Sequence, residues 1–181
     1  MKPAVFFERD GVLNEAWVER HHQVGPLTLD EFKIHVEAAS TLNQLREAGY
    51  VLIATTNQPG LSQGYQSRVL LERMHQMLRA QLQIDDVFVC PHDETDRCPC
   101  RKPREGLLLE AAYKWRLDLD RSFVVSDKWQ DAQAARAAGC TSLLIQSPWI
   151  GTVHRDFLVA DLGTAVEKIL ALRNADAALA F

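Results

Sequence analysis

The chain has 181 residues, of which 47% are hydrophobic and 24% are charged, with a formal net charge of −4. This length predicts one domain, and the composition excludes a disordered chain. The charge offers no general footprint for nucleic acid or an anionic membrane, and no apolar run is long enough to span a bilayer, so we expect neither partner.

Apolar segments of strand length alternate with segments of helical periodicity. Leu70, Met74 and Leu78, for example, have the spacing of an amphipathic helix, with Ser67 as its candidate N-cap. We expect strands at residues 4–7, 50–55, 86–90, 122–125 and 141–146. We expect helices at residues 37–48, 70–82, 105–115, 129–138 and 161–172, a covering loop at 14–28, and a tail at 173–181.

Strands separated by helices imply parallel pairing through right-handed crossovers. The expected fold is therefore α/β, a doubly wound parallel sheet in a three-layer sandwich with about five main strands. We expect a single domain over residues 1–172 with little or no cap domain. With no signal-peptide pattern, the cytoplasm is the expected location.

Two carboxylates directly follow the first predicted strand. Glu8 and Asp10 are separated by one residue and precede Gly11, whose conformational freedom permits a tight turn. Ligands of open α/β sheets bind at the carboxyl ends of the strands, where two acidic groups can converge on one cation. The sequence therefore predicts a site at this position.

Other polar residues follow the later strands. Thr56 and Asn57 suit an anion at a strand-to-helix turn, although such a pair is also typical of a turn or a helix start. Asp127 ends the fourth strand, where an aspartate is commonly an N-cap. Arg101 and Lys102 are, taken alone, typical of a solvated surface, and a loop lysine is expected to contribute little to the core.

A cluster of metal-binding residues is the strongest signal in the sequence. Three thiols and one imidazole fall within eleven residues, which meets the needs of a closed tetrahedral Zn²⁺ site. The alternative is a reduced, metal-free loop or a redox pair. A closed site would be structural and would staple the loop at 90–102. The four residues are Cys90, His92, Cys98 and Cys100.

In this order the motifs resemble those of the haloacid dehalogenase-like phosphatases. The four similar stretches are Glu8 to Gly11, Thr56-Asn57, Arg101-Lys102-Pro103 and Asp127 with Asp131. The zinc loop, Asn14 and Gly60 are most similar to the branch that contains D,D-heptose-1,7-bisphosphate phosphatases and histidinol phosphatases.

The resemblance implies a Mg²⁺-dependent phosphatase of a small sugar or alcohol phosphate, similar to a heptose bisphosphate. A carboxylate would attack phosphorus, and water would hydrolyse the acyl phosphate. The implied catalytic residues are Glu8, Asp10 and Lys102. The implied substrate contacts are Thr56, Asn57, Arg101 and Lys102. The implied magnesium ligands are Glu8, Asp10 and Asp127. The implied partner is a small phosphorylated metabolite, bound by a monomer.

Glu8 departs from the family pattern at the nucleophile, which the family supplies as aspartate. One extra methylene moves the carboxylate by ~1.5 Å if the backbone holds still, and a misplacement of about 1 Å can cost on the order of 10²-fold in rate. Two interpretations follow. The first is a phosphatase. The alternative is a catalytically impaired phosphatase-like protein that binds a phosphorylated metabolite or a partner.

Overall fold

The computed structural model describes the backbone of residues 1–179 and the side chains of residues 1–175. Six strands form one sheet in the order β5-β4-β1-β6-β7-β8, and every neighbouring pair is parallel. The predicted doubly wound α/β fold is therefore confirmed. The strands are β1 (Ala4–Glu8), β4 (Val51–Asn57), β5 (Asp86–Cys90), β6 (Phe123–Ser126), β7 (Thr141–Ile145) and β8 (Phe157–Val159).

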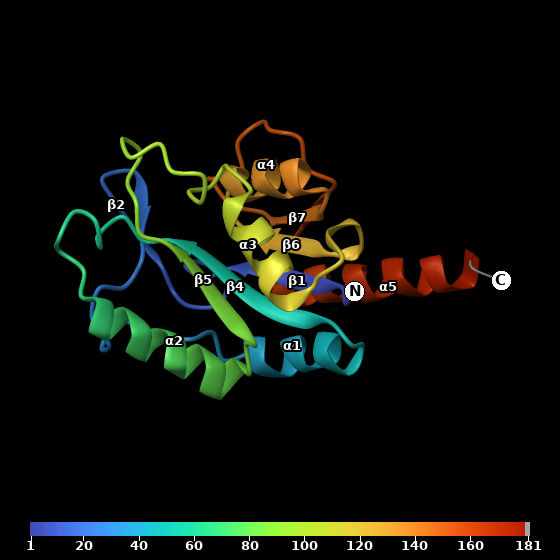
Figure 1. The fold of residues 1–181 in the computed structure, drawn as a ribbon. Helices are drawn as coiled ribbons and strands as arrows, with labels where there is room; N and C mark the ends of the chain where they lie inside the picture. The colour runs from blue at the N-terminus through green and yellow to red at the C-terminus, as the bar shows by residue number, and fades with distance from the viewer. Residues whose placement is uncertain (180–181) are drawn as a thin grey trace.

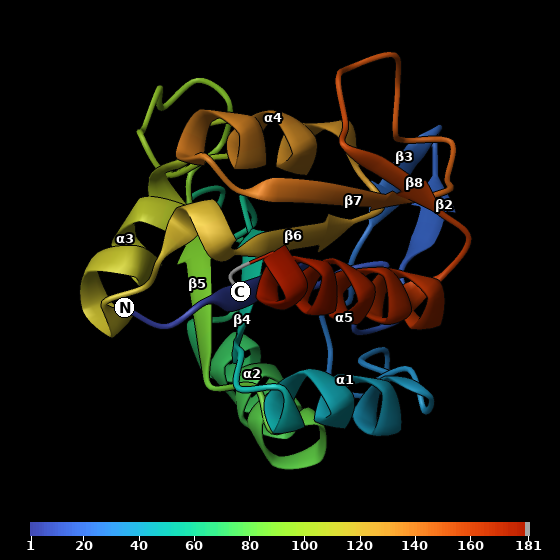
Figure 2. The same cartoon turned by 90° about the vertical axis from the view of Figure 1, so that its right-hand side faces the viewer.

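Helices cover both faces of the sheet, as Figures 1 and 2 show. One face carries α1 (Ala38–Glu47), α2 (Arg68–Leu82) and α5 (Leu162–Leu179), and the other carries α3 (Gly106–Trp115) and α4 (Trp129–Ala138). A short 3₁₀ helix, η1, spans Leu119–Arg121. No helix in the described part of the chain has the length and apolar character needed to cross a membrane.

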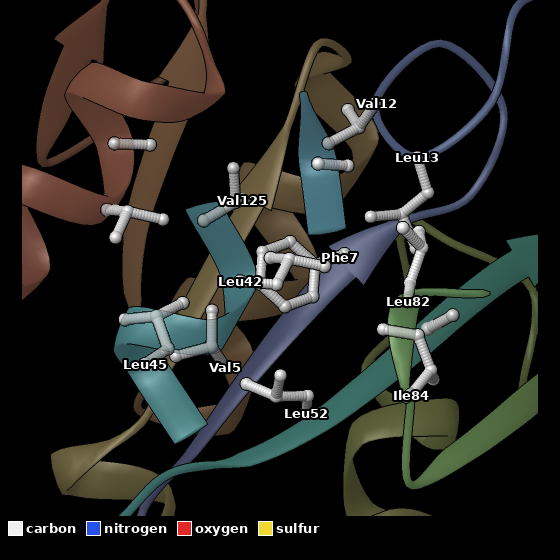
Figure 3. Packing of buried hydrophobic residues seen from close by; sticks show 14 of the residues in the cluster. Val5, Phe7, Val12, Leu13, Leu42, Leu45, Leu52, Leu82, Ile84 and Val125 are labelled. Carbon is white, nitrogen blue, oxygen red and sulfur yellow. The ribbon is translucent and has the colours of Figure 1, made fainter. Parts of the chain in front are cut away.

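The central strand β1 separates two hydrophobic clusters because its side chains alternate between the faces of the sheet. Val5 and Phe7 belong to the cluster under α1, α2 and α5, whereas Ala4 and Phe6 belong to the cluster under α3 and α4. Figure 3 shows Phe7 packed beside Leu42 of α1. Burying a side chain of this kind stabilises the fold by about 1.5–3 kcal/mol. The strand that carries Glu8 is thus anchored from both sides.

Two elements differ from the expectation or extend it, and one predicted helix cap is confirmed. A sixth strand, β8, has only three residues, which is too short to produce a recognisable period. Helix α5 continues to Leu179, through most of the segment that was expected to be a tail. The expected N-cap of α2 is present, since the Ser67 hydroxyl accepts a hydrogen bond from the Leu70 amide at 3.4 Å.

The expected loop at 14–28 contains an antiparallel hairpin, β2 (Trp17–Glu19) and β3 (His22–Val24). Its turn residues, Arg20 and His21, have φ angles of 47° and 67°. Such left-handed turns usually carry asparagine, aspartate or glycine, so the Arg-His pair gave no hairpin signal. In Figure 1 the hairpin lies at the same end of the sheet as the connections that follow β4 and β5.

Candidate active site

A cavity of about 690 Å³ lies at the carboxyl ends of the central strands. It is where an open α/β sheet is expected to bind its ligand. Glu8 comes from the end of β1, and Asn57 from the end of β4. The site residues predicted from sequence that line it are Glu8, Asp10, Asn57, Arg101 and Lys102. Segments far apart in the chain thus meet at one opening.

The Glu8 carboxylate is held from two directions. Its Oε1 accepts hydrogen bonds from the backbone amides of Arg9, at 2.9 Å, and Asp10, at 3.3 Å. Its Oε2 accepts one from Lys102 Nζ. Burial alone would raise the pKa of Glu8, but the positive charges of Lys102 and Lys128 lower it to about 2. Glu8 is therefore an anion at neutral pH.

Lys102 lies in the interior, which corrects the expectation that this loop lysine contributes little to the core. The residue is only 5% exposed, and its Nζ also donates a hydrogen bond to Asp131 Oδ1 at 2.7 Å. Burial would lower the pKa of Lys102, but the charges of Asp131 and Glu8 raise it. Burial raises the pKa of Asp131 to about 6, against the opposing charge of Lys102. One buried lysine thus bridges two buried carboxylates.

The Asp10 carboxylate is surrounded by hydrogen-bond donors. Arg9 binds it with two nitrogens, Nε to Oδ1 and Nη2 to Oδ2, each at 2.9 Å. Asn14 donates to Oδ1 at 2.9 Å, and Gln58 donates to Oδ2 at 2.8 Å. A side chain at Gly25 would collide with this carboxylate, so the close approach of the chain after β3 requires glycine. Asp10 is therefore held in one orientation.

Arg9 and His75 form a buried layer behind Asp10 that the sequence did not reveal. Arg9 is fully buried, and its Nη1 lies 3.2 Å from His75 Nε2, so this imidazole nitrogen is the acceptor. Burial and the charge of Arg9 lower the pKa of His75 to about 3. In the sequence, His75 is only one residue of an amphipathic helix. Its role depends on how α2 packs against the turn after β1.

Three oxygen atoms converge on one cation, the ammonium group of Lys128. Lys128 Nζ lies 2.6 Å from the Asp10 carbonyl oxygen, 3.0 Å from Asp127 Oδ1 and 3.8 Å from Glu8 Oε2. A carbonyl and two carboxylates are the hard oxygen ligands that suit Mg²⁺. The donor set therefore fits this ion, with Asp10 contributing its backbone oxygen. Sequence reasoning missed Lys128, although its place directly after Asp127 was a usable signal.

The turn that carries Asp127 is fixed from both sides. Gln23 of the hairpin donates to Asp127 Oδ2 at 2.8 Å. The Ser126 hydroxyl donates to Asp131 Oδ2 at 2.9 Å and accepts from the Lys128 amide at 3.0 Å. The hairpin and the start of α4 therefore set where this carboxylate points.

The other residues predicted to contact the substrate form hydrogen bonds mainly with other groups of the protein. The buried Thr56 hydroxyl accepts from Gln58 Nε2 at 2.8 Å. Asn57 bonds the backbone of Lys102, with its Nδ2 and Oδ1 each 3.3 Å from their partners. Arg101 donates to the His92 carbonyl oxygen at 3.1 Å. Asn57 and Arg101 thus fix the loop that presents Lys102, and both still line the cavity.

The four predicted zinc ligands are brought together at the end of β5, with their ligand atoms all within 4.8 Å of one another. Cys90 Sγ lies 3.6 Å from Cys98 Sγ and 3.3 Å from Cys100 Sγ, and His92 Nδ1 lies 3.3 Å from Cys100 Sγ. In a tetrahedron with Zn–S bonds of ~2.3 Å, the sulfurs would be about 3.8 Å apart. The cluster therefore fits a closed zinc site.

The chain is similar to known proteins over most of its length. The model of the haloacid dehalogenase-like hydrolase family matches residues 5–139. A D-glycero-beta-D-manno-heptose-1,7-bisphosphate 7-phosphatase of Rhodopseudomonas palustris is 36% identical over 92% of this chain and 96% of its own length. One of Haemophilus influenzae is 34% identical over 76% of this chain and 78% of its own. A crystal structure of a D,D-heptose 1,7-bisphosphate phosphatase from B. bronchiseptica, complexed with magnesium and phosphate, has a TM-score of 0.80 and 29% identity and covers 93% of this chain and 98% of its own.

Proposed function

Because the chain belongs to the haloacid dehalogenase-like hydrolases, we propose that its cavity hydrolyses a phosphate monoester of a heptose bisphosphate-like sugar. The observation that carries the proposal is that Glu8, Asp10 and Lys102 line one cavity. Beside them, three oxygen atoms of Glu8, Asp10 and Asp127 face the Lys128 ammonium group. The relatives' action on D-glycero-D-manno-heptose 1,7-bisphosphate supports the sugar as substrate.

Glu8 is the proposed nucleophile. Its carboxylate, which is anionic at neutral pH, attacks phosphorus and forms an acyl phosphate as the bond to the leaving oxygen breaks. For this step Asp10 has to carry a proton, so one of the donors at its two oxygens has to move away. Asp10 gives that proton to the leaving oxygen, and in the second step it takes a proton from the water that releases phosphate and regenerates Glu8. Lys102 stabilises the negative charge on the transferring group. Arg9 and Asn14 hold Asp10 in the orientation that both proton transfers need.

The proposed magnesium ligands are the Glu8 and Asp127 carboxylates and the Asp10 carbonyl oxygen. When bound, the ion supplies positive charge that lowers the barrier to attack on a phosphate dianion. Thr56, Asn57 and Arg101 remain the proposed substrate contacts. We propose that Cys90, His92, Cys98 and Cys100 hold a structural Zn²⁺, which would keep Arg101 and Lys102 in place. The single domain over residues 1–172, the monomer and the cytoplasmic location stay predictions.

The alternative, a binding protein without turnover, rests on the extra methylene of Glu8. Lys102 supports this alternative, because its ammonium group is already bonded to Glu8 and Asp131 and is therefore less available to a phosphate group. Asp10 argues the other way, because it lines the cavity together with Glu8, and binding of a phosphate anion alone does not require a second carboxylate there.

The test is release of phosphate from D-glycero-β-D-manno-heptose 1,7-bisphosphate, measured with Mg²⁺ and with EDTA. We expect Mg²⁺-dependent release that Asp10→Asn abolishes, because the leaving oxygen then lacks a proton donor. Equal release by the parent and by Asp10→Asn would contradict the proposed mechanism. Binding of the sugar bisphosphate with no release by the parent would favour the alternative.

A further inference from the structure

One wall of the cavity is built from residues that the proposed chemistry does not use. Trp129 and Gln130 follow Lys128 in the first turn of α4, and Trp149 lies in the connection between β7 and β8. We propose that these three side chains form a subsite for the hydroxylated ring of the leaving group. The inference rests on the proposed phosphatase function and adds the residues that recognise the sugar itself.

The wall is fixed to the turn that carries the cation-facing groups. The Trp129 amide donates to the Trp149 carbonyl oxygen at 3.0 Å. The Ser147 hydroxyl donates to the Asp127 carbonyl oxygen at 2.5 Å and accepts from the Trp149 amide at 3.0 Å. Gly151 packs on Trp129, where an added Cβ would lie 3.7 Å from the tryptophan Cβ. The surface is therefore already formed before a ligand binds, at a fixed position relative to the reacting groups. Less conformational entropy is then lost on binding.

The polar atoms of this wall lack partners in the described part of the protein. The tryptophans outside the cavity have paired indole N–H groups, since Trp17 donates to Glu19 at 3.2 Å and Trp115 donates to Asp86 at 2.9 Å. Among the described residues, neither Trp129 nor Trp149 has a partner for its indole N–H.

The Gln130 side chain also has a polar atom without a protein partner. Its Oε1 is enclosed and has no hydrogen-bond partner among the described side chains and backbone. An enclosed polar atom without a partner costs about 1–3 kcal/mol. A turn of the side-chain amide that brings Oε1 to a donor on a ligand would recover part of that free energy.

These features match a sugar ring better than other leaving groups. The C–H face of a pyranose can lie against an indole ring, its hydroxyl oxygens can accept from the indole N–H groups, and a hydroxyl can donate to Gln130 Oε1. An aromatic leaving group would use the ring faces but would leave Gln130 unpaired. The cavity of about 690 Å³ also has room for more than a phosphate group. The chemistry of the wall therefore selects a polyhydroxylated ring.

The experiment compares binding of two probes by titration calorimetry in the Asp10→Asn background, where the sugar substrate is not consumed. The probes are D-glycero-β-D-manno-heptose 1,7-bisphosphate and inorganic phosphate, both with Mg²⁺. Trp149→Ala should weaken binding of the sugar bisphosphate by about tenfold, from the lost stacking and hydrogen bond, and leave phosphate affinity within about twofold. Gln130→Ala should also weaken only the sugar probe, and Trp149→Phe, which keeps a ring, should have a smaller effect than Trp149→Ala. Trp115→Phe, outside the cavity, is the matched control and should change neither affinity.

Two results would overturn the subsite. Unchanged affinity for the sugar bisphosphate in Trp149→Ala would show that the tryptophan makes no contact with the ring. Equal weakening of both probes would show general damage to the phosphate site. Failure of the proposed function is a separate result, because it would appear as binding by the parent without release of phosphate.

Discussion

Replacing Lys102 by methionine should strongly destabilise the fold, because it removes the nearest counter-charge of two buried carboxylates and leaves only the more distant Lys128, 3.8 Å from Glu8 Oε2. The side chains of Lys102, Glu8 and Asp131 are 4%, 5% and 1% exposed, so water cannot take the place of the lysine. Removing one partner of a buried ion pair costs about 3–5 kcal/mol. For a chain of this size, 1 kcal/mol corresponds to about 2–4 °C in Tm. We therefore expect Tm to fall by ~6–20 °C.

The assay is urea and thermal unfolding followed by circular dichroism. Lys114→Met is the matched control, because the Lys114 side chain is 60% exposed, so the pair is open to water on the lysine side, and the 11% exposed Asp86 side chain keeps the hydrogen bond from the Trp115 indole N–H. Such a pair contributes about 0–1 kcal/mol. Adding Asp131→Asn to Lys102→Met should recover part of the loss by removing one uncompensated charge. If Lys102→Met and Lys114→Met lose equal stability, the buried bridge does not exist as described.

Three further predictions concern the zinc loop, the cation position and the layer behind Asp10. Elemental analysis should find about one zinc per chain, and chelation should lower Tm; a folded sample without bound transition metal would refute the site. Lys128→Met should bind Mg²⁺ about tenfold more tightly by calorimetry, because the removed ammonium faces the same three oxygens; weaker binding would show that Lys128 does not compete with the ion. The pKa of His75 is about 3 in the folded protein, against an ordinary value of 6.5. Between these two pH values the unfolded chain binds a proton that the folded chain does not, so the free energy of unfolding falls as the pH drops through this range. Between pH 7 and pH 5 the loss should be about 2 kcal/mol smaller in His75→Gln than in the parent, measured by urea unfolding, while His154→Gln, at an exposed histidine, should match the parent.

The sequence predicted those parts of the site that depend on local signals. Helices with clear ends, such as the one that begins after Ser67 and the one that stops at Gly139, are close to their expected bounds. Glu8 and Asp10 lie at the end of β1 as expected, because a buried strand followed by polar residues defines its own end. The four predicted zinc ligands meet because their spacing is short enough for one loop to bring them together.

The parts that could not be predicted depend on contacts between distant segments. Burial of Lys102 results from Asp131, which is 29 residues away, and the role of Arg9 depends on His75, which is 66 residues away. The hairpin was missed because its turn residues, Arg20 and His21, are unusual for that backbone conformation. Propensity and periodicity carry no information about such pairs.

Turnover by Glu8 variants tests the central claim most directly, namely that this cavity is a phosphatase site with glutamate as its nucleophile. The measurement is kcat for phosphate release from D-glycero-β-D-manno-heptose 1,7-bisphosphate by the parent, Glu8→Gln and Glu8→Asp. We predict slow release by the parent and none by Glu8→Gln. Glu8→Asp should release phosphate about tenfold faster than the parent or more, because the shorter side chain returns the carboxylate to the distance from phosphorus that the site requires. Release by Glu8→Gln at the rate of the parent would contradict the claim.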